Sequence, residues 1–311
     1  MKRLLDVLRS TPVRVGFLVI ALAAAVYAVV REWDSIVAAA WGMSPWSLVG
    51  ALAASIVYVL LTMMAWRALL ADMGTRLAPG PSFAVFFVSQ LGKYLPGGVW
   101  NILAAAEMGA DHEIPRRRSV SVMVVTVVVS IVTGLGLAAA TMPFAPQQLS
   151  ESYGWTIYVL PLFVIVLLPP VLNRLLDVAL RVTGRPPLEH PVSWTGVARC
   201  VMWTLLSWVA AGLQVWLLAE GLGLPASPST FALSVGGYAM AWTVGFLVIF
   251  VPAGAGVREA VLALVLAGSL SRGGIVAVVL LSRVILTAAD LIMGGGGLTA
   301  GRHHKAARVA A

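Results

Sequence analysis

Charged side chains are scarce in this sequence, and their scarcity excludes an ordinary soluble domain. Asp, Glu, Lys and Arg together make up 11% of the 311 residues, whereas hydrophobic residues make up 60%. A soluble domain usually carries about 25% charged residues. Apolar runs of about 20 residues recur along the chain, and each is long enough to cross a bilayer as a helix. The sequence therefore predicts an all-α, polytopic helical membrane protein.

Cysteine and the common cofactor motifs are also missing or nearly so. Cys200 is the single cysteine, which excludes an intrachain disulfide and a multi-cysteine metal site. The four histidines fall in predicted loops or in the tail, without the spacing of helical metal ligands. The sequence has no Walker A loop, dinucleotide fingerprint or nucleophile elbow. We therefore expect no metal, no cofactor and no enzymatic activity of this chain.

Six apolar stretches are long enough to cross the bilayer. They are residues 13–30, 47–66, 120–142, 155–172, 197–218 and 274–298. Residues 173–185 mix apolar and charged positions, which indicates a short helix on the membrane surface. The spans follow one another without a large polar insertion, so we expect a single transmembrane domain over residues 1–311.

Two further apolar regions, residues 82–108 and 231–268, are interrupted by proline and glycine, which end helices. The breaks consist of Pro96, Gly97 and Gly98 in the first region and of Pro252, Gly254 and Gly256 in the second. The first region's pieces of about 14 and 10 residues reach roughly 21 and 15 Å, too short for a 30 Å hydrocarbon core. They predict a re-entrant hairpin. The second region is either re-entrant or spanning, because its first half is long enough to cross alone.

The basic residues between the spans fall almost entirely on one side of this scheme, with Arg31 and Arg272 as the exceptions. The positive-inside rule assigns that side, and both termini with it, to the cytoplasm. The same rule explains the net charge of +8 without nucleic acid as a partner. We therefore expect a multi-pass protein of the bacterial inner (cytoplasmic) membrane.

The order of span, broken hairpin and span occurs twice, at residues 47–142 and 197–298. In the predicted topology the two copies enter the membrane from opposite sides. Many transporters build a binding site near the bilayer midplane from such inverted repeats with paired broken helices. The sequence therefore predicts an inverted repeat with a site between its halves.

Six charged residues lie within or beside apolar segments, where a charge costs about 2.5 to 3.5 kcal/mol and needs a partner or a watery cavity. The candidates for substrate binding are Lys93, Glu107, Arg258, Glu259, Arg283 and Asp290. Tyr94 joins them because it follows Lys93 at the first break.

Arg258 and Glu259 open a half-helix after the second break, where the helix dipole and free N–H groups favour an anion. An arginine there can bind a phosphate bidentately. Simpler interpretations stay open for the others. Glu107 marks the return of the hairpin to water or binds substrate, Lys93 snorkels to the interface or binds a phosphate, and Arg283 with Asp290 serves structure or substrate.

Three blocks carry a family resemblance: residues 90–100 (QLGKYLPGGVW), 251–260 (VPAGAGVREA) and 282–283 (SR). Together they resemble the lysylphosphatidylglycerol synthase transmembrane region family, also called the flippase-like domain. The resemblance implies a lipid translocator. In the bifunctional members a separate cytoplasmic domain makes the aminoacylated lipid. Residues 301–311 are too few for such a domain, so we do not expect lipid synthesis by this chain.

The leading hypothesis is translocation of an anionic or aminoacylated phospholipid, or of another lipid-linked headgroup. One alternative is a proton-coupled carrier of a small anion that depends on Glu259 or Asp290. Another is a membrane scaffold subunit without transport activity. The expected partners are a membrane lipid and either a second copy of the chain or an enzyme of envelope synthesis.

Overall fold

The computed structural model describes residues 37, 41–94, 100–145, 147–182, 184, 190–248 and 254–309. The predicted span at residues 13–30 and the break residues Pro96, Gly97, Gly98 and Pro252 lie outside these ranges. Within the described residues the chain is helical, and its β-structure is limited to one isolated bridge between Ala267 and Leu270. The all-α prediction is confirmed.

Six stretches of the described chain are long and apolar enough to cross a membrane. They are α4 (Pro45–Asp72), α7 (Arg116–Thr141), the α8-to-α9 stretch (Leu149–Leu167), α11 (Trp194–Glu220), α12 (Pro228–Leu247) and α14 (Arg272–Val309). Five of them overlap predicted spans, and α12 is additional. The protein is thus a polytopic helical membrane protein.

The fourth predicted span differs in its boundaries from the helices that form. The span was predicted over residues 155–172, whereas the structure has α8 (Gln147–Tyr153), the 3₁₀ segment η3 (Gly154–Val159) and α9 (Leu160–Leu167). The chain turns at Leu168, whose ψ of 128° is extended, and α10 (Pro169–Val182) follows. Proline suits the first position of a helix because its fixed φ is helical and its missing N–H needs no partner. The surface helix therefore begins at Pro169 and not near residue 173.

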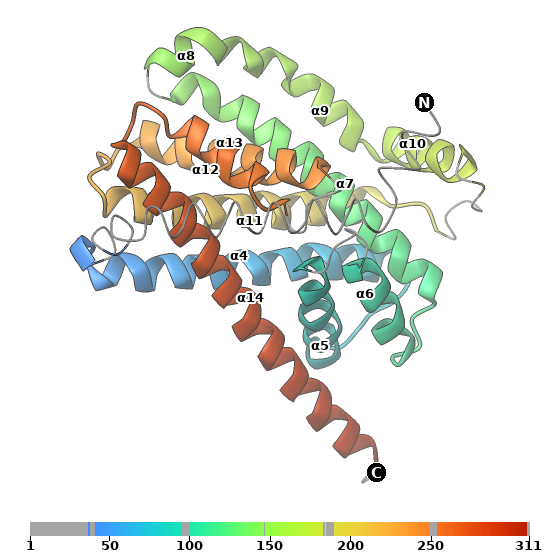
Figure 1. Ribbon diagram of the computed structural model, residues 1–311. Coiled ribbons are helices and arrows are strands. Elements are labelled where there is room, and N and C mark those ends of the chain that lie inside the picture. The colour runs from blue at the N-terminus through green and yellow to red at the C-terminus, as the bar shows by residue number, and fades with distance from the viewer. Residues whose placement is uncertain are drawn as a thin grey trace, which may run out of the picture.

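The first broken region forms α5 (Pro79–Gln90), the 3₁₀ segment η1 (Leu91–Tyr94) and α6 (Trp100–Ala110). Helices α5 and α6 lie side by side (Figure 1), and α5 also packs along α14. At 1.5 Å per residue they extend about 18 and 16 Å, well short of the hydrocarbon thickness of about 30 Å. Neither helix can cross the bilayer alone, as the sequence predicts.

The second broken region is asymmetric. Its first part, α12, has 20 residues and reaches about 30 Å, whereas α13 (Val257–Val265) has nine and reaches about 14 Å. Gly254 (φ 68°) and Gly256 (φ 83°) adopt left-handed backbone angles directly before α13. Residues with a Cβ rarely take such angles, which explains glycine at both positions. By length, α12 can therefore span and α13 cannot.

Helices α4 and α11 form an antiparallel pair through the middle of the bundle (Figure 1). Near one end Gly50 faces Leu217, and at the other the Asp72 carboxylate accepts a hydrogen bond of 2.8 Å from the backbone N–H of Ser193. Glycine also brings α11 onto α12, because a Cβ at Gly212 would lie only 2.4 Å from Cα of Val235. Small residues at such contacts allow close van der Waals packing between membrane helices.

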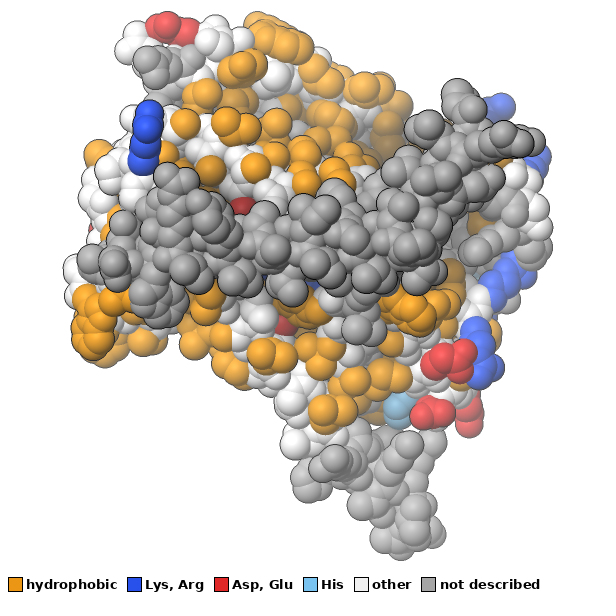
Figure 2. All heavy atoms as spheres, in the orientation of Figure 1, with side chains coloured by type: hydrophobic (Ala, Val, Ile, Leu, Met, Phe, Trp, Pro, Cys, Tyr) orange, Lys and Arg blue, Asp and Glu red, His pale blue; other side chains and the backbone are white. Residues whose placement is uncertain are grey.

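Basic side chains gather at the end of the bundle where α4 ends and where α7 and α11 begin (Figure 2). Arg118 joins two of these ends by donating a hydrogen bond of 2.8 Å from Nη1 to Oγ1 of Thr75. The same end carries Arg67, Arg76, Arg116, Arg117 and Arg199. These arginines share one side, as the charge pattern predicts, and the assignment of that side to the cytoplasm stays a prediction.

The two halves present their helices in a similar order. Helix α4, the α5–α6 hairpin and α7 are followed later in the chain by α11, the α12–α13 segment and α14. Helix α14 crosses the bundle diagonally, and its C-terminal end projects away from the other helices (Figure 1). The opposite orientation of the two halves in the membrane stays a prediction.

Candidate functional site

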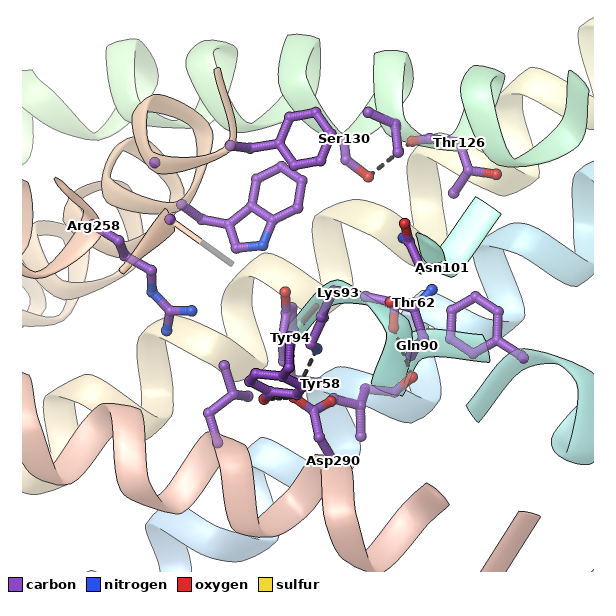
Figure 3. Close-up of a pocket in the computed structure, with 18 of the residues that line it drawn as sticks. Tyr58, Thr62, Gln90, Lys93, Tyr94, Asn101, Thr126, Ser130, Arg258 and Asp290 are labelled. Atoms are coloured by element: carbon purple, nitrogen blue, oxygen red, sulfur yellow. Dashed lines mark hydrogen bonds and ion pairs between the residues drawn. The ribbon is translucent and has the colours of Figure 1, made fainter. Parts of the chain in front are cut away.

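A cavity of about 180 Å³ lies where the two broken regions meet the long helices (Figure 3). Apolar side chains such as Phe86 and Trp242 form part of its wall, and polar side chains from α4, α5, η1, α6, α7, α13 and α14 form the rest. The polar lining comprises Tyr58, Thr62, Gln90, Lys93, Tyr94, Asn101, Thr126, Ser130, Arg258, Arg283 and Asp290. Residues from both broken regions therefore share one cavity.

Asp290 on α14 holds the first broken region at this cavity. One of its oxygens, Oδ2, lies 2.7 Å from Nζ of Lys93 and accepts a hydrogen bond of 2.5 Å from the hydroxyl of Tyr94 (Figure 3). The Asp290 side chain is only 3% exposed, whereas that of Lys93 is 27% exposed. A carboxylate buried to this extent needs such partners to offset its lost hydration. Lys93 thus faces the cavity while it neutralises Asp290.

Gly92 explains how η1 comes close enough to take part. A Cβ on Gly92 would lie 2.7 Å from the backbone N of Asn101 and 2.8 Å from the carbonyl carbon of Trp100. These are backbone atoms of the first turn of α6, so a larger residue would force α6 away from η1. The glycine before Lys93 is therefore needed to bring Lys93, Tyr94 and Asn101 to one wall.

Arg258, in the first turn of α13, is the cation that the fold buries most deeply at this cavity. The residue is 6% exposed, and its side chain extends toward the cavity in Figure 3. Nη2 donates a hydrogen bond of 2.7 Å to the hydroxyl of Tyr238, and the guanidinium lies 4.6 Å from the centre of the same ring. Among the described residues no carboxylate forms an ion pair with Arg258. Since a guanidinium has five N–H donors, most of them remain for a ligand.

Glu259, the neighbour of Arg258, is not among the residues that line the cavity. Its Oε2 accepts a hydrogen bond of 2.5 Å from the backbone N–H of Gly256, which caps the start of α13. Its Oε1 lies 3.6 Å from Nη1 of Arg283. Glu259 therefore fixes the helix start and holds Arg283, which does line the cavity, in place.

Glu107 lies apart from the cavity. Its side chain is 65% exposed and pairs with Arg116 through two hydrogen bonds of 2.9 and 2.8 Å. The hydrogen bonds and charge of Arg116 hold the pKa of Glu107 below its ordinary value. Of the two interpretations of Glu107, this placement favours the one in which it marks the return of the hairpin to water.

Several residues that line the cavity are polar but uncharged, so a search of the sequence for charged residues does not find them. Thr126 and Ser130 are four residues apart on α7 and so share one face of an otherwise apolar helix. Asn101 follows the first break directly, and Tyr58 lies in the middle of α4. The sequence does contain a signal for Thr126 and Ser130, because they are polar residues spaced four apart inside an apolar span.

The comparison with protein families identifies the kind of protein that carries this cavity. The model of the lysylphosphatidylglycerol synthase transmembrane region matches residues 14–294. The chain belongs to this family. The match covers both broken regions and every residue that lines the cavity, so the cavity is part of the lysylphosphatidylglycerol synthase transmembrane region itself. A search of curated proteins gave no match.

Proposed function

We propose that the protein translocates a lipid by passing its phosphate-bearing headgroup through the cavity between the broken regions. The observation that carries this proposal is the burial of Arg258 beside the cavity without a carboxylate partner among the described residues. A buried charge in a membrane protein usually faces a partner or a substrate pathway. An anionic phosphate supplies the missing partner and matches the guanidinium geometry.

The charge of the whole lining supports an anionic ligand. Lys93, Arg258 and Arg283 line the cavity together with one carboxylate, Asp290. Glu259 pairs with Arg283 from outside the lining, so the cluster keeps an excess of one positive charge. Hydroxyl and amide groups on the same lining offer further hydrogen bonds to phosphate oxygens. Asp290 also contributes one negative charge to the cavity lining, which suits a headgroup that carries an amino group beside its phosphate. Anionic and aminoacylated phospholipids are therefore the substrate classes we propose.

The size of the cavity favours a headgroup over a whole lipid. Pockets that enclose drug-sized molecules measure about 300 to 1,000 Å³, whereas this cavity measures about 180 Å³. We infer that the acyl chains stay in the bilayer while the headgroup crosses. A carrier of this type needs only a polar path for the headgroup, since the chains lose no contact with lipid.

The ion pair between Lys93 and Asp290 can be exchanged for a contact with the headgroup as the headgroup passes through the cavity. Phosphate oxygens compete with the carboxylate for the Lys93 ammonium, because both form charge-assisted hydrogen bonds with it. Transfer of Lys93 to the phosphate would loosen η1 from α14, where Tyr94 still donates to Asp290. Binding of the headgroup would thus be coupled to movement of the first broken region.

The proposal is tested in proteoliposomes of the purified protein that contain trace fluorescent lipid and a membrane-impermeant quencher outside. Phosphatidylglycerol, its lysyl derivative and neutral phosphatidylcholine are compared. We expect faster exposure of an anionic or lysylated lipid than of phosphatidylcholine. Equal rates with and without protein for all three lipids would argue against translocation of these lipids, and uptake of a soluble anion in the same vesicles would assign the cavity to a solute carrier.

A further inference from the structure

A second hollow, of about 480 Å³, lies outside the central cavity where α4 ends beside the start of α11. Its lining includes Arg67, Arg76, Arg199, Asp72, Met64 and Trp203. It contains none of the residues that line the central cavity. We call this hollow the α4–α11 groove.

The groove has an excess of positive charge that the described part of the chain does not neutralise. Its lining contains three arginines and a single carboxylate, that of Asp72. That carboxylate is occupied by α11, since Oδ2 accepts the Ser193 N–H at 2.8 Å and Oδ1 accepts the Ser193 hydroxyl. A negative charge at this position also interacts favourably with the positive end of the helix dipole. Asp72 therefore holds the two helices together instead of pairing with an arginine.

The arginines keep most of their donors for a ligand. Among the residues that the structure describes, Arg67, Arg76 and Arg199 form no ion pair. One protein hydrogen bond is found for the three groups, from Nε of Arg67 to the carbonyl of Leu77 at 3.3 Å. Guanidinium groups bind phosphate in planar, paired hydrogen bonds, and basic pockets between membrane helices bind anionic headgroups.

Apolar side chains continue from the groove toward the middle of the membrane helices. Leu60 lies two turns before Arg67 on α4, and Leu206, which is 45% exposed, lies two turns after Arg199 on α11. Residues two turns apart share a helix face, and the two helices run antiparallel. Both apolar tracks therefore lead away from the charged end, with Met64 and Trp203 between them and the arginines.

We propose that the α4–α11 groove binds the phosphate of an anionic phospholipid from the surrounding bilayer, with an acyl chain along Trp203 and Leu206. The shared chemistry is a phosphate between guanidinium groups, and the apolar track is what assigns it to a lipid instead of free phosphate. The inference does not rest on translocation, because the α4–α11 groove shares no lining residue with the central cavity.

The first test reads the groove through Trp203. The full-length protein is placed in vesicles of phosphatidylcholine that contain a minor fraction of either brominated-chain phosphatidylglycerol or brominated-chain phosphatidylcholine. The phosphatidylglycerol should quench more tryptophan fluorescence, and Trp203→Phe should reduce this excess. Equal quenching by the two lipids, or an excess of unchanged size in Trp203→Phe, would overturn the proposal.

The second test changes the charge. Arg76 and Arg199 are both exposed, so Arg76→Gln/Arg199→Gln should fold. Binding of short-chain phosphatidylglycerol to the detergent-solubilised protein should weaken by about tenfold or more, because each arginine near an anionic headgroup adds appreciably to binding. The matched control is Arg174→Gln/Arg181→Gln on α10, which removes the same charge from another exposed surface.

The control pair should change binding by no more than about twofold. Equal weakening in both double variants would reduce the effect to general surface charge and contradict the site. Binding of inorganic phosphate as tight as that of phosphatidylglycerol would contradict a lipid site. These binding results do not depend on whether the wild-type protein translocates lipid. The lipid site in the groove and translocation through the central cavity can therefore be contradicted independently.

Discussion

Nζ of Lys93 lies 2.7 Å from Oδ2 of Asp290, which joins the first broken region to the last long helix at the wall of the cavity. The carboxylate is buried and the ammonium is partly exposed to the cavity. This asymmetry leaves the lysine accessible to an incoming anion. The ion pair is therefore both a structural link and a contact that a headgroup can exchange.

Asp290→Asn should destabilise the protein by removing one partner of this pair. Loss of one member of a buried pair costs about 3 to 5 kcal/mol, and the cost here should be smaller because Lys93 keeps some exposure. Thermal unfolding in detergent measures the change. In Lys93→Met/Asp290→Asn both charges are absent, and its loss should be less than the sum of the single losses. Additive losses would show that the two side chains do not interact.

Tyr238→Phe tests how Arg258 is held. The change removes the hydroxyl that accepts the hydrogen bond from Arg258 but keeps the ring below the guanidinium. A hydrogen bond to a charged group contributes about 1.5 to 3 kcal/mol, so a loss of this order is expected in unfolding experiments. Translocation should fall less than in Arg258→Gln, since the cation is retained. Activity as low as that of Arg258→Gln would make Tyr238 a residue that acts on the substrate itself.

Gly212→Ala tests the close contact between α11 and α12. The new Cβ would lie 2.4 Å from Cα of Val235, and backbone cannot give way as a flexible side chain can. Overpacking of this kind costs about 1 to 3 kcal/mol. Gly295→Ala in α14 is the matched control, because nothing lies within 4 Å of its added Cβ. The control should unfold at the wild-type temperature or above, and a lower unfolding temperature in both variants would contradict the packing argument.

The pair of Glu107 and Arg116 predicts a small dependence of stability on pH. The pKa of Glu107 is lower in the folded protein than its ordinary value of 4.5. The stabilisation is therefore present above pH 4.5 and is lost as the pH falls through the lowered pKa. Arg116→Gln should return the pKa of Glu107 toward 4.5, as a carboxyl titration followed by isotope-edited infrared spectroscopy would show. An unchanged pKa would mean that the pair does not persist.

Labelling of introduced cysteines tests the predicted topology. In a Cys200→Ser background, Arg76→Cys and Arg272→Cys place a thiol at opposite ends of the spans. If both termini are cytoplasmic, an impermeant maleimide should label residue 272 in intact cells and residue 76 only after the membrane is opened. The reverse pattern would invert the topology.

The positions of most helices were predictable because the bilayer imposes a simple requirement of length and hydrophobicity. Helices α4, α7, α11 and α14 follow directly from their apolar runs, and the short α5 and α6 follow from the break between them. The start of α10 was missed because Pro169 was taken to lie within a span, although proline suits a helix start.

The partners within the cavity were not predictable, because they depend on packing between distant segments. The sequence marks Lys93, Arg258 and Asp290 as costly charges, but it does not show that Asp290 accepts from Lys93 and Tyr94 or that Arg258 lies over Tyr238. Likewise, the apolar surroundings of Glu107 made it a candidate, whereas its partner is the exposed Arg116.

The central claim is tested most directly by comparing Arg258→Gln with wild type in the proteoliposome assay, with Arg116→Gln as a control for loss of an exposed arginine. Each variant must first be shown to insert and to unfold cooperatively. The account predicts that the anionic or lysylated lipid that wild type exposes fastest is exposed at the protein-free rate in Arg258→Gln and near the wild-type rate in Arg116→Gln. Wild-type exposure rates in Arg258→Gln would contradict a headgroup path through this cavity.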